Sequence, residues 1–211
     1  MIKLLIFDLD NTLFDTYTQL GINVVEKMIV QLRKFGLTKE QERALREKYH
    51  ITGFRILANQ LGFSEEMKHI GMETYKNMDL SQIKPFDDIK LIPALKQKKT
   101  LVTSGLIDVQ MKKVEILGLN GMFNEVAVDE SSSHENKQRI FANLMKKYKA
   151  KPAETMIIGD NPESELAAGN NLGIITVQIL RRPDMLKGKA DYHVKDLYEV
   201  KEILKVLKND R

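Results

Sequence analysis

Short apolar runs and helical patterns alternate along most of the chain. Residues 2–7 form a compact apolar run that ends at Asp8, which is typical of a strand buried on both faces of a parallel sheet. Further strand patterns follow at residues 100–103, 125–128, 155–158, 174–179 and 192–194. Helical patterns lie between or after them, at residues 109–117, 135–148, 163–170 and 197–207. Strands that alternate with helices predict an α/β fold with a doubly wound parallel sheet.

The segment between the first strand and residue 85 has helical patterns only. Its first apolar series recurs at helical spacing, at Leu20, Val24, Met28, Leu32 and Phe35. Thr38 and Gln41 form the pattern of a capping box, and Ser64 is placed to cap a later helix. We therefore predict a discontinuous, Rossmann-like α/β core at residues 1–15 and 86–211. An all-helical domain at residues 16–85 interrupts it.

Composition and charge indicate an ordinary globular protein. The net charge of +4 is mild for 211 residues, and the lysine cluster at residues 146–151 is typical of a solvated helix face, so we expect no nucleic-acid partner. No apolar run approaches the ~20 residues that cross a bilayer, and the first run lacks the basic start and cleavage site of a secretory signal. The absence of cysteine excludes disulfides and thiol catalysis. We expect a cytoplasmic protein without a membrane partner, and a monomer by default.

Polar side chains follow three of the predicted strands. Asp8 and Asp10 come after the first strand, Thr103 and Ser104 close the second, and Asp160 follows the run at residues 156–159. Open parallel sheets bind ligands beyond the carboxyl ends of their strands. These polar groups therefore predict a site at one edge of the sheet.

The residue types at this edge suit phosphoryl transfer. A carboxylate such as Asp8 can attack phosphorus, and Asp8 with Asp160 can supply the carboxylates that hold Mg²⁺. Asp10 is placed to act as a general acid and then as a base. The hydroxyl of Thr103 and the ammonium of Lys137 can hold phosphoryl oxygens, and the loop at Ser104 adds backbone donors.

Four segments occur in an order that is known from one family. LLIFDLDNTLFD contains an apolar strand followed by DxDxT, and TLVTSG carries Thr103. Lys137 precedes a short apolar pair, and IIGDNPESELAAG carries Asp160 and Glu165. Together they resemble the four motifs of the haloacid dehalogenase-like (HAD) superfamily, and the resemblance covers essentially the whole chain.

This resemblance implies a role for each motif residue. Asp8 would be the nucleophile, and Asp10 would be the general acid/base that also gives its backbone carbonyl to Mg²⁺. Asp160 would be a direct metal ligand, and Glu165 would fill the second acidic position of the metal site, where the family usually has aspartate. Thr103 and Lys137 would bind the phosphoryl group. In this chain Ser104 stands where asparagine is common.

The helical segment resembles the C1-type cap of this superfamily, which closes over the substrate. Arg55 lies where such caps often carry a substrate-specificity loop, so it can bind an anionic group of the substrate. An exposed helix arginine without such a role is the alternative. The dehalogenase branch lacks an aspartate at the position of Asp10, so the chain resembles the phosphatase branch.

We predict a Mg²⁺-dependent phosphatase that hydrolyses small phosphorylated metabolites through an aspartyl phosphate. A sugar phosphomutase would use the same core residues and return the phosphoryl group to a substrate hydroxyl. A binding or regulatory protein with low turnover is a third hypothesis, although a pure binder needs no acid/base at Asp10.

Overall fold

The structure is a computed structural model that describes residues 1–131 and 134–209, and it contains two compact units. The larger unit combines Met1–Asp15 with Lys84–Arg211, and the smaller unit is Thr16–Ile83. The hydrophobic pattern places the second boundary at residue 85, close to the point where the chain re-enters the larger unit.

The larger unit is built on a six-stranded sheet in which each strand runs parallel to its neighbours. The strands are β1 (Leu4–Phe7), β2 (Lys98–Ser104), β3 (Glu125–Asp129), β4 (Thr155–Gly159), β5 (Ile175–Ile179) and β6 (Tyr192–Val194). Their order is β3-β2-β1-β4-β5-β6, which confirms the predicted doubly wound sheet. The chain builds outward from β1 on one side and returns to build from β4 on the other. The switch point of the topology therefore lies between β1 and β4, where such sheets bind ligands.

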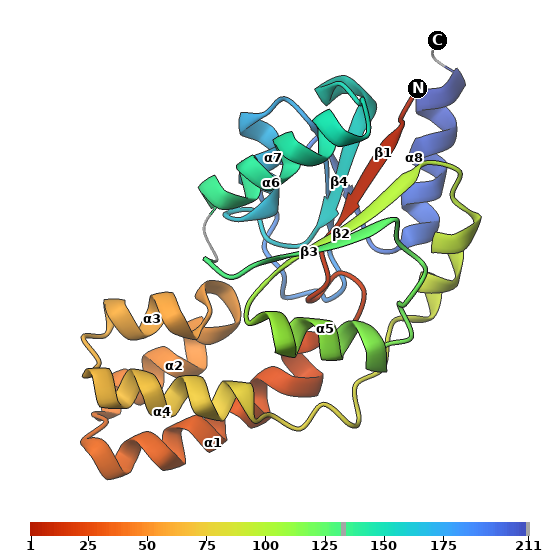
Figure 1. The fold of residues 1–211 in the computed structure, drawn as a ribbon. Coiled ribbons are helices and arrows are strands. Elements are labelled where there is room, and N and C mark those ends of the chain that lie inside the picture. Colours follow the sequence, from red (N-terminus) through yellow and green to blue (C-terminus); the bar gives the residue numbers. More distant parts are fainter. Residues whose placement is uncertain (132–133, 210–211) are drawn as a thin grey trace. The chain divides into compact units, whose positions relative to one another are not determined.

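Both faces of the sheet are covered by helices. Figure 1 shows α6 (His134–Lys147) and α7 (Glu165–Asn171) together on one side and α8 (Leu197–Asn209) on the other. Leu4 and Ile6 point to the α6/α7 side, where they join one apolar cluster with Phe141. All four residues of β1 are buried, which explains why this strand is a compact apolar run rather than an alternating one.

Three further elements complete the larger unit. α5 (Ile107–Ile116) connects β2 to β3, and two 3-10 helices, η3 (Asp87–Ala94) and η4 (Pro152–Glu154), lie where the hydrophobic pattern predicts no element. η3 carries Pro93, and proline lacks the N–H that an α-helix interior requires. Because η3 is a 3-10 helix and not an α-helix, its sequence carries no 3.6-residue apolar repeat.

A buried ion pair fastens the loop after β1 to the rest of this unit. Arg181 donates to both carboxylate oxygens of Asp88, over 2.6 and 3.1 Å, and twice to the carbonyl oxygen of Thr12, over 3.0 and 2.8 Å. Asp88 also accepts a 2.7 Å hydrogen bond from the backbone N–H of Leu197 at the start of α8. Four segments of the chain, at residues 12, 88, 181 and 197, are thus held together around one pair of charges.

The secondary-structure elements of the smaller unit are all helices, as the sequence predicts. This unit contains the π-helix η1 (Tyr17–Gly21), α1 (Ile22–Leu32), the 3-10 helix η2 (Arg33–Phe35), α2 (Lys39–Thr52), α3 (Phe54–Gln60) and α4 (Glu65–Lys76). The predicted capping box is present, since Thr38 Oγ1 accepts from the backbone N–H of Gln41 over 3.2 Å and Gln41 Oε1 accepts from that of Thr38 over 3.0 Å. Leu20, Val24, Met28 and Leu32 are buried.

The last member of that apolar series departs from the prediction. Phe35 is 40% exposed rather than inward-facing. The α-helix ends at Leu32 and continues as the tighter η2, so the 3.6-residue period no longer carries residue 35 to the buried face. Gly36 then stops the helix with a left-handed φ of 84°.

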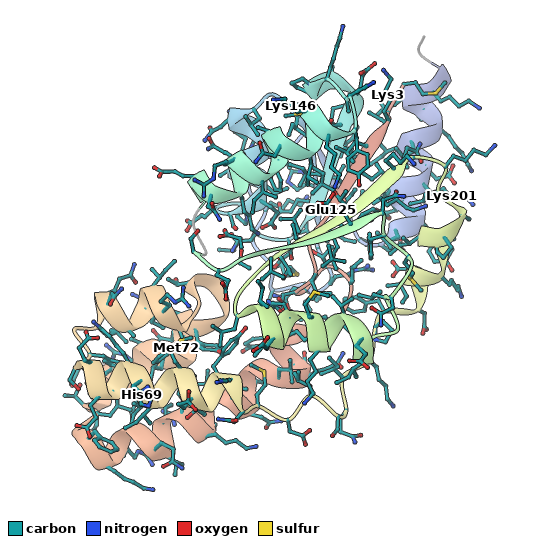
Figure 2. All side chains as sticks on the ribbon, in the orientation of Figure 1. Lys3, His69, Met72, Glu125, Lys146 and Lys201 are labelled. Atoms are coloured by element: carbon teal, nitrogen blue, oxygen red, sulfur yellow. The ribbon has the colours of Figure 1, made fainter. Side chains whose placement is uncertain are left out.

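The outer surface of the larger unit carries many lysines. Lys146 on α6 and Lys201 on α8 are both exposed, and Figure 2 shows their places on the ribbon. Within residues 1–131 and 134–209, none of the helices combines the length and the apolar character needed to cross a bilayer.

Candidate active site

Two of the predicted acids flank the switch point of the sheet. Asp8 directly follows β1, and its backbone N–H donates to the carbonyl oxygen of Ile158 in β4 over 2.9 Å. Asp160 directly follows β4. Because the two strands are parallel and adjacent, both carboxylates leave the sheet at the same edge. Carboxylate oxygens of Asp8, Asp160 and Glu165 all lie within 4.8 Å of one another.

Lys137 connects two of these acids. Its ammonium lies 3.0 Å from Glu165 Oε2 and 3.4 Å from Asp8 Oδ1, and all three side chains are at most 8% exposed. Glu165 is held on its other oxygen by the backbone N–H of Asn161, over 2.6 Å. Glu165 therefore links α6 to the loop after β4, and it fixes the ammonium beside Asp8.

The charges in this cluster do not balance, because three acids share one lysine: Asp8 and Glu165 are buried, and Asp160 is half-buried. Burial raises the pKa of the Asp8 carboxyl, which Lys137 lowers only in part and which Glu165 and Asp160 raise further. Burial also raises the pKa of Asp160, and the charge of Glu165 adds to the effect. For Lys137, burial disfavours the charged form, but the carboxylates of Glu165 and Asp8 outweigh it and raise the pKa. Lys137 is thus a permanent cation among acids that favour a further positive charge.

Asp10 lies in a different environment from Asp8. Its Oδ1 accepts from the ammonium of Lys113 over 2.7 Å, and its Oδ2 accepts from Gln110 Nε2 over 3.0 Å and from the hydroxyl of Thr103 over 3.4 Å. A quarter of the Asp10 side chain is exposed, whereas that of Lys113 is 3% exposed. Residues of α5 thus hold the Asp10 carboxylate, and part of its side chain stays accessible to solvent.

The other predicted substrate-binding residues fall in two places. Thr103 and Ser104 end β2, next to β1, and the hydroxyl of Ser104 is buried with no hydrogen-bond partner among the described residues. Arg55 is exposed on α3 of the smaller unit. The structure therefore brings seven of the predicted residues into one part of the larger unit, namely Asp8, Asp10, Thr103, Ser104, Lys137, Asp160 and Glu165.

Gln110 and Lys113 are contacts of this site that the motif reading missed. Both are buried on α5, in line with Val114 and Leu117. These four positions repeat as i, i+3, i+4 and i+7, which marks the buried face of a helix. A polar glutamine and a charged lysine on the apolar face of a predicted helix could have indicated these contacts, because a buried charged residue needs a partner.

The acidic cluster fits a small divalent cation. Mg²⁺ prefers oxygen ligands and is usually held by one or two carboxylates together with water and phosphate oxygens. Asp8 and Asp160 supply such oxygens, and with Glu165 they place three carboxylates around the single ammonium of Lys137. Glu165 is already held by Lys137 and a backbone N–H.

Comparison with known proteins agrees with this geometry. A family model described as haloacid dehalogenase-like hydrolase matches residues 5–179, a range that contains all four motifs. A glyceraldehyde 3-phosphate phosphatase from Methanopyrus kandleri is 28% identical, over 86% of this chain and 85% of that protein. One of the same name from Methanocaldococcus jannaschii is 27% identical over the full length of both. A solved haloacid dehalogenase-like family hydrolase from Streptococcus pneumoniae superposes with a TM-score of 0.75 at 18% identity, covering 96% of this chain and 98% of that chain.

Proposed function

Because the chain belongs to the haloacid dehalogenase-like hydrolase family, we propose that it is a phosphatase that hydrolyses small phosphate monoesters. The observation that carries this proposal is the pair Asp8 and Asp10 at the end of β1. Asp8 contacts the buried ammonium of Lys137, whereas Asp10 has separate partners and stays partly exposed. Two carboxylates in different environments suit two different roles.

The proposed reaction uses these carboxylates in sequence. An oxygen of Asp8 forms a bond to phosphorus while the bond from phosphorus to the ester oxygen breaks, and Asp10 gives its proton to that departing oxygen. Water then attacks the phosphorus of the aspartyl phosphate and gives a proton to Asp10. The bond between phosphorus and Asp8 breaks, which releases inorganic phosphate and restores both carboxyl groups.

Other residues of the site would stabilise the charge on the phosphoryl group. Lys137 is fixed beside Asp8 by Glu165, so its ammonium is in place before the substrate binds. Thr103, at the end of β2, is proposed to donate to a phosphoryl oxygen. Asp8, Asp160 and the backbone carbonyl of Asp10 would hold Mg²⁺. The ion, when bound, would offset the negative charge of the phosphate oxygens.

The relatives suggest the first substrate to test. The matching curated proteins carry the name glyceraldehyde 3-phosphate phosphatase, and the proteins from Methanopyrus kandleri and Methanocaldococcus jannaschii cover most or all of this chain. We therefore propose a three-carbon phosphate ester as the substrate class. Arg55, exposed on α3 of the smaller unit, stays a prediction for substrate binding.

The test measures release of inorganic phosphate from glyceraldehyde 3-phosphate with Mg²⁺, next to a panel of other phosphate esters. The variant Asp8→Asn should lose at least about 1,000-fold in kcat and keep its far-UV circular dichroism. The exposed Asp108, changed to Asn, is the matched control and should keep full activity. Full activity of Asp8→Asn would overturn the proposal. Isomerisation of a hexose phosphate without release of phosphate would assign the phosphomutase activity instead.

A further inference from the structure

Lys113 is a buried cation that the proposed reaction does not use. It is 2% exposed, and its ammonium lies 2.7 Å from Asp10 Oδ1 and 5.6 Å from the centre of the Phe14 ring. Burying a charged lysine is costly unless it is paired, and methionine would fill a similar volume in a helix without that cost. A lysine at this position is therefore better explained by what it does to Asp10 than by its packing.

Gln110 reinforces the same contact from one turn earlier on α5. Its side-chain amide donates to Asp10 Oδ2 over 3.0 Å and also to the backbone carbonyl of Ser104 at the end of β2. Gln110 is 1% exposed, so the amide is itself fixed in place. The two residues hold one oxygen each of the Asp10 carboxylate, which fixes both the position of this group and the plane in which it lies.

We propose that Lys113 and Gln110 are positioning residues that hold the Asp10 carboxylate in line with the departing ester oxygen. This inference rests on the proposed phosphatase function. In the first step the proton moves from Asp10 to that oxygen as the bond to phosphorus breaks, so the transfer depends on the orientation of the carboxyl group. Lys113 and Gln110 themselves touch neither the phosphorus nor the ester oxygen in this assignment.

The dependence on the leaving group separates this role from a purely structural one. An alkyl phosphate such as glyceraldehyde 3-phosphate needs its leaving oxygen protonated, whereas 2,4-dinitrophenyl phosphate releases a stable phenolate without a proton. The ratio kcat/KM reports the steps up to the departure of this group, so it does not include the later attack of water. Loss of the orientation of Asp10 should therefore lower kcat/KM selectively for the alkyl ester.

The experiment compares both esters in Lys113→Met and in Lys112→Met, which removes an exposed charge from the neighbouring position of the same helix. Lys113→Met should lower kcat/KM about 100-fold for glyceraldehyde 3-phosphate, within the range that general acid catalysis contributes. For 2,4-dinitrophenyl phosphate the decrease should be at least tenfold smaller. Lys112→Met should match the wild type with both esters.

Gln110→Met provides a second variant, which leaves the ammonium of Lys113 in place beside Asp10; far-UV circular dichroism of both variants checks that the fold is kept. Gln110→Met should lower kcat/KM about tenfold for the alkyl ester and much less for the aryl ester. If the wild type hydrolyses both esters, the inference would be overturned by variants that lose kcat/KM equally for both esters, or that lose it for neither. A wild type that hydrolyses neither ester would instead refute the proposed function.

Discussion

Gly159, the last residue of β4, has no room for a side chain. A Cβ at this position would lie 2.4 Å from Cγ, 2.5 Å from Oε1 and 2.8 Å from Cδ of Glu165. Ordinary contacts between carbon atoms are about 3.5–4.0 Å, so Gly159→Ala must displace the Glu165 side chain. The displaced carboxylate loses its contacts with Lys137 and with the backbone N–H of Asn161.

The cost of this substitution follows from the contacts that are lost. Hydrogen bonds to charged groups contribute about 1.5–3 kcal/mol each. Moving the Glu165 carboxylate away from Asp8 and Asp160 recovers part of that loss, because the three acids repel one another. We therefore expect Gly159→Ala to lower the free energy of unfolding by about 2–4 kcal/mol. In a chain of this size that corresponds to roughly 5–15 °C in the unfolding midpoint.

Urea and thermal unfolding of four proteins measure this effect: the wild type, Gly159→Ala, Glu165→Ala and the double variant. Glu165→Ala removes the three atoms that lie nearest to the new methyl group, so on that background Gly159→Ala should cost less than about 0.5 kcal/mol. Gly21→Ala is the control for the substitution itself, since the nearest atom to its Cβ lies 3.6 Å away. Equal costs of Gly159→Ala on the two backgrounds would refute the steric reasoning.

Three further predictions concern the charges of the larger unit. Asp88→Ala should lower the free energy of unfolding by about 3–5 kcal/mol, because it leaves the buried Arg181 unpaired, whereas Ala at the exposed Asp87 should change it little; equal effects in urea unfolding would contradict the role of the pair. Without metal, Asp8→Asn should raise the unfolding midpoint more at pH 8 than at pH 5. Because the pKa of Asp8 is raised in the folded state, ionising this carboxyl destabilises the folded wild type progressively as the pH rises from about 4 through the raised pKa. A stabilisation by Asp8→Asn that became smaller at higher pH would contradict this direction of the pKa shift. Finally, 10 mM Mg²⁺ should raise the unfolding midpoint of the wild type, and EDTA should reverse the rise. The rise should be lost in Asp160→Asn, and an unchanged rise in that variant would argue against Asp160 as a ligand.

Elements whose sequence pattern reflects burial were predicted well. Residues 155–158 were predicted as a strand, and β4 is Thr155–Gly159. The fully apolar β1 indicated a strand with helices on both faces, which fixes the sheet as parallel and doubly wound. Because parallel strands end at the same edge, the convergence of Asp8 and Asp160 also followed from the strand assignment.

Features that depend on local helix geometry could not be predicted from the pattern of apolar residues. The 3-10 helix η3 has no apolar repeat of 3.6 residues, and the change from α1 to η2 turns Phe35 outward. The ion pair between Arg181 and Asp88 joins residues 93 positions apart, so no local pattern reveals it. Contacts of this kind become visible only when the chain is folded.

Burial also separates the two lysines of the candidate site from the surface lysines, a distinction that the sequence alone does not make. The chain has 33 lysines and arginines, and two lysines are buried within residues 1–131 and 134–209, namely Lys113 and Lys137. Each contacts one of the two acids that follow β1, Lys113 from α5 and Lys137 from α6.

This arrangement gives two carboxylates only two residues apart distinct surroundings. Asp8 is enclosed with further acids and a fixed cation, which suits a group that attacks phosphorus once a metal ion offsets the excess charge. Asp10 is held on both oxygens from α5 and stays partly open, which suits a group that exchanges a proton with the substrate. Different roles require different environments, and here separate helices supply them. The division of labour that we propose within the DxD motif therefore depends on α5 and α6 as much as on the motif itself.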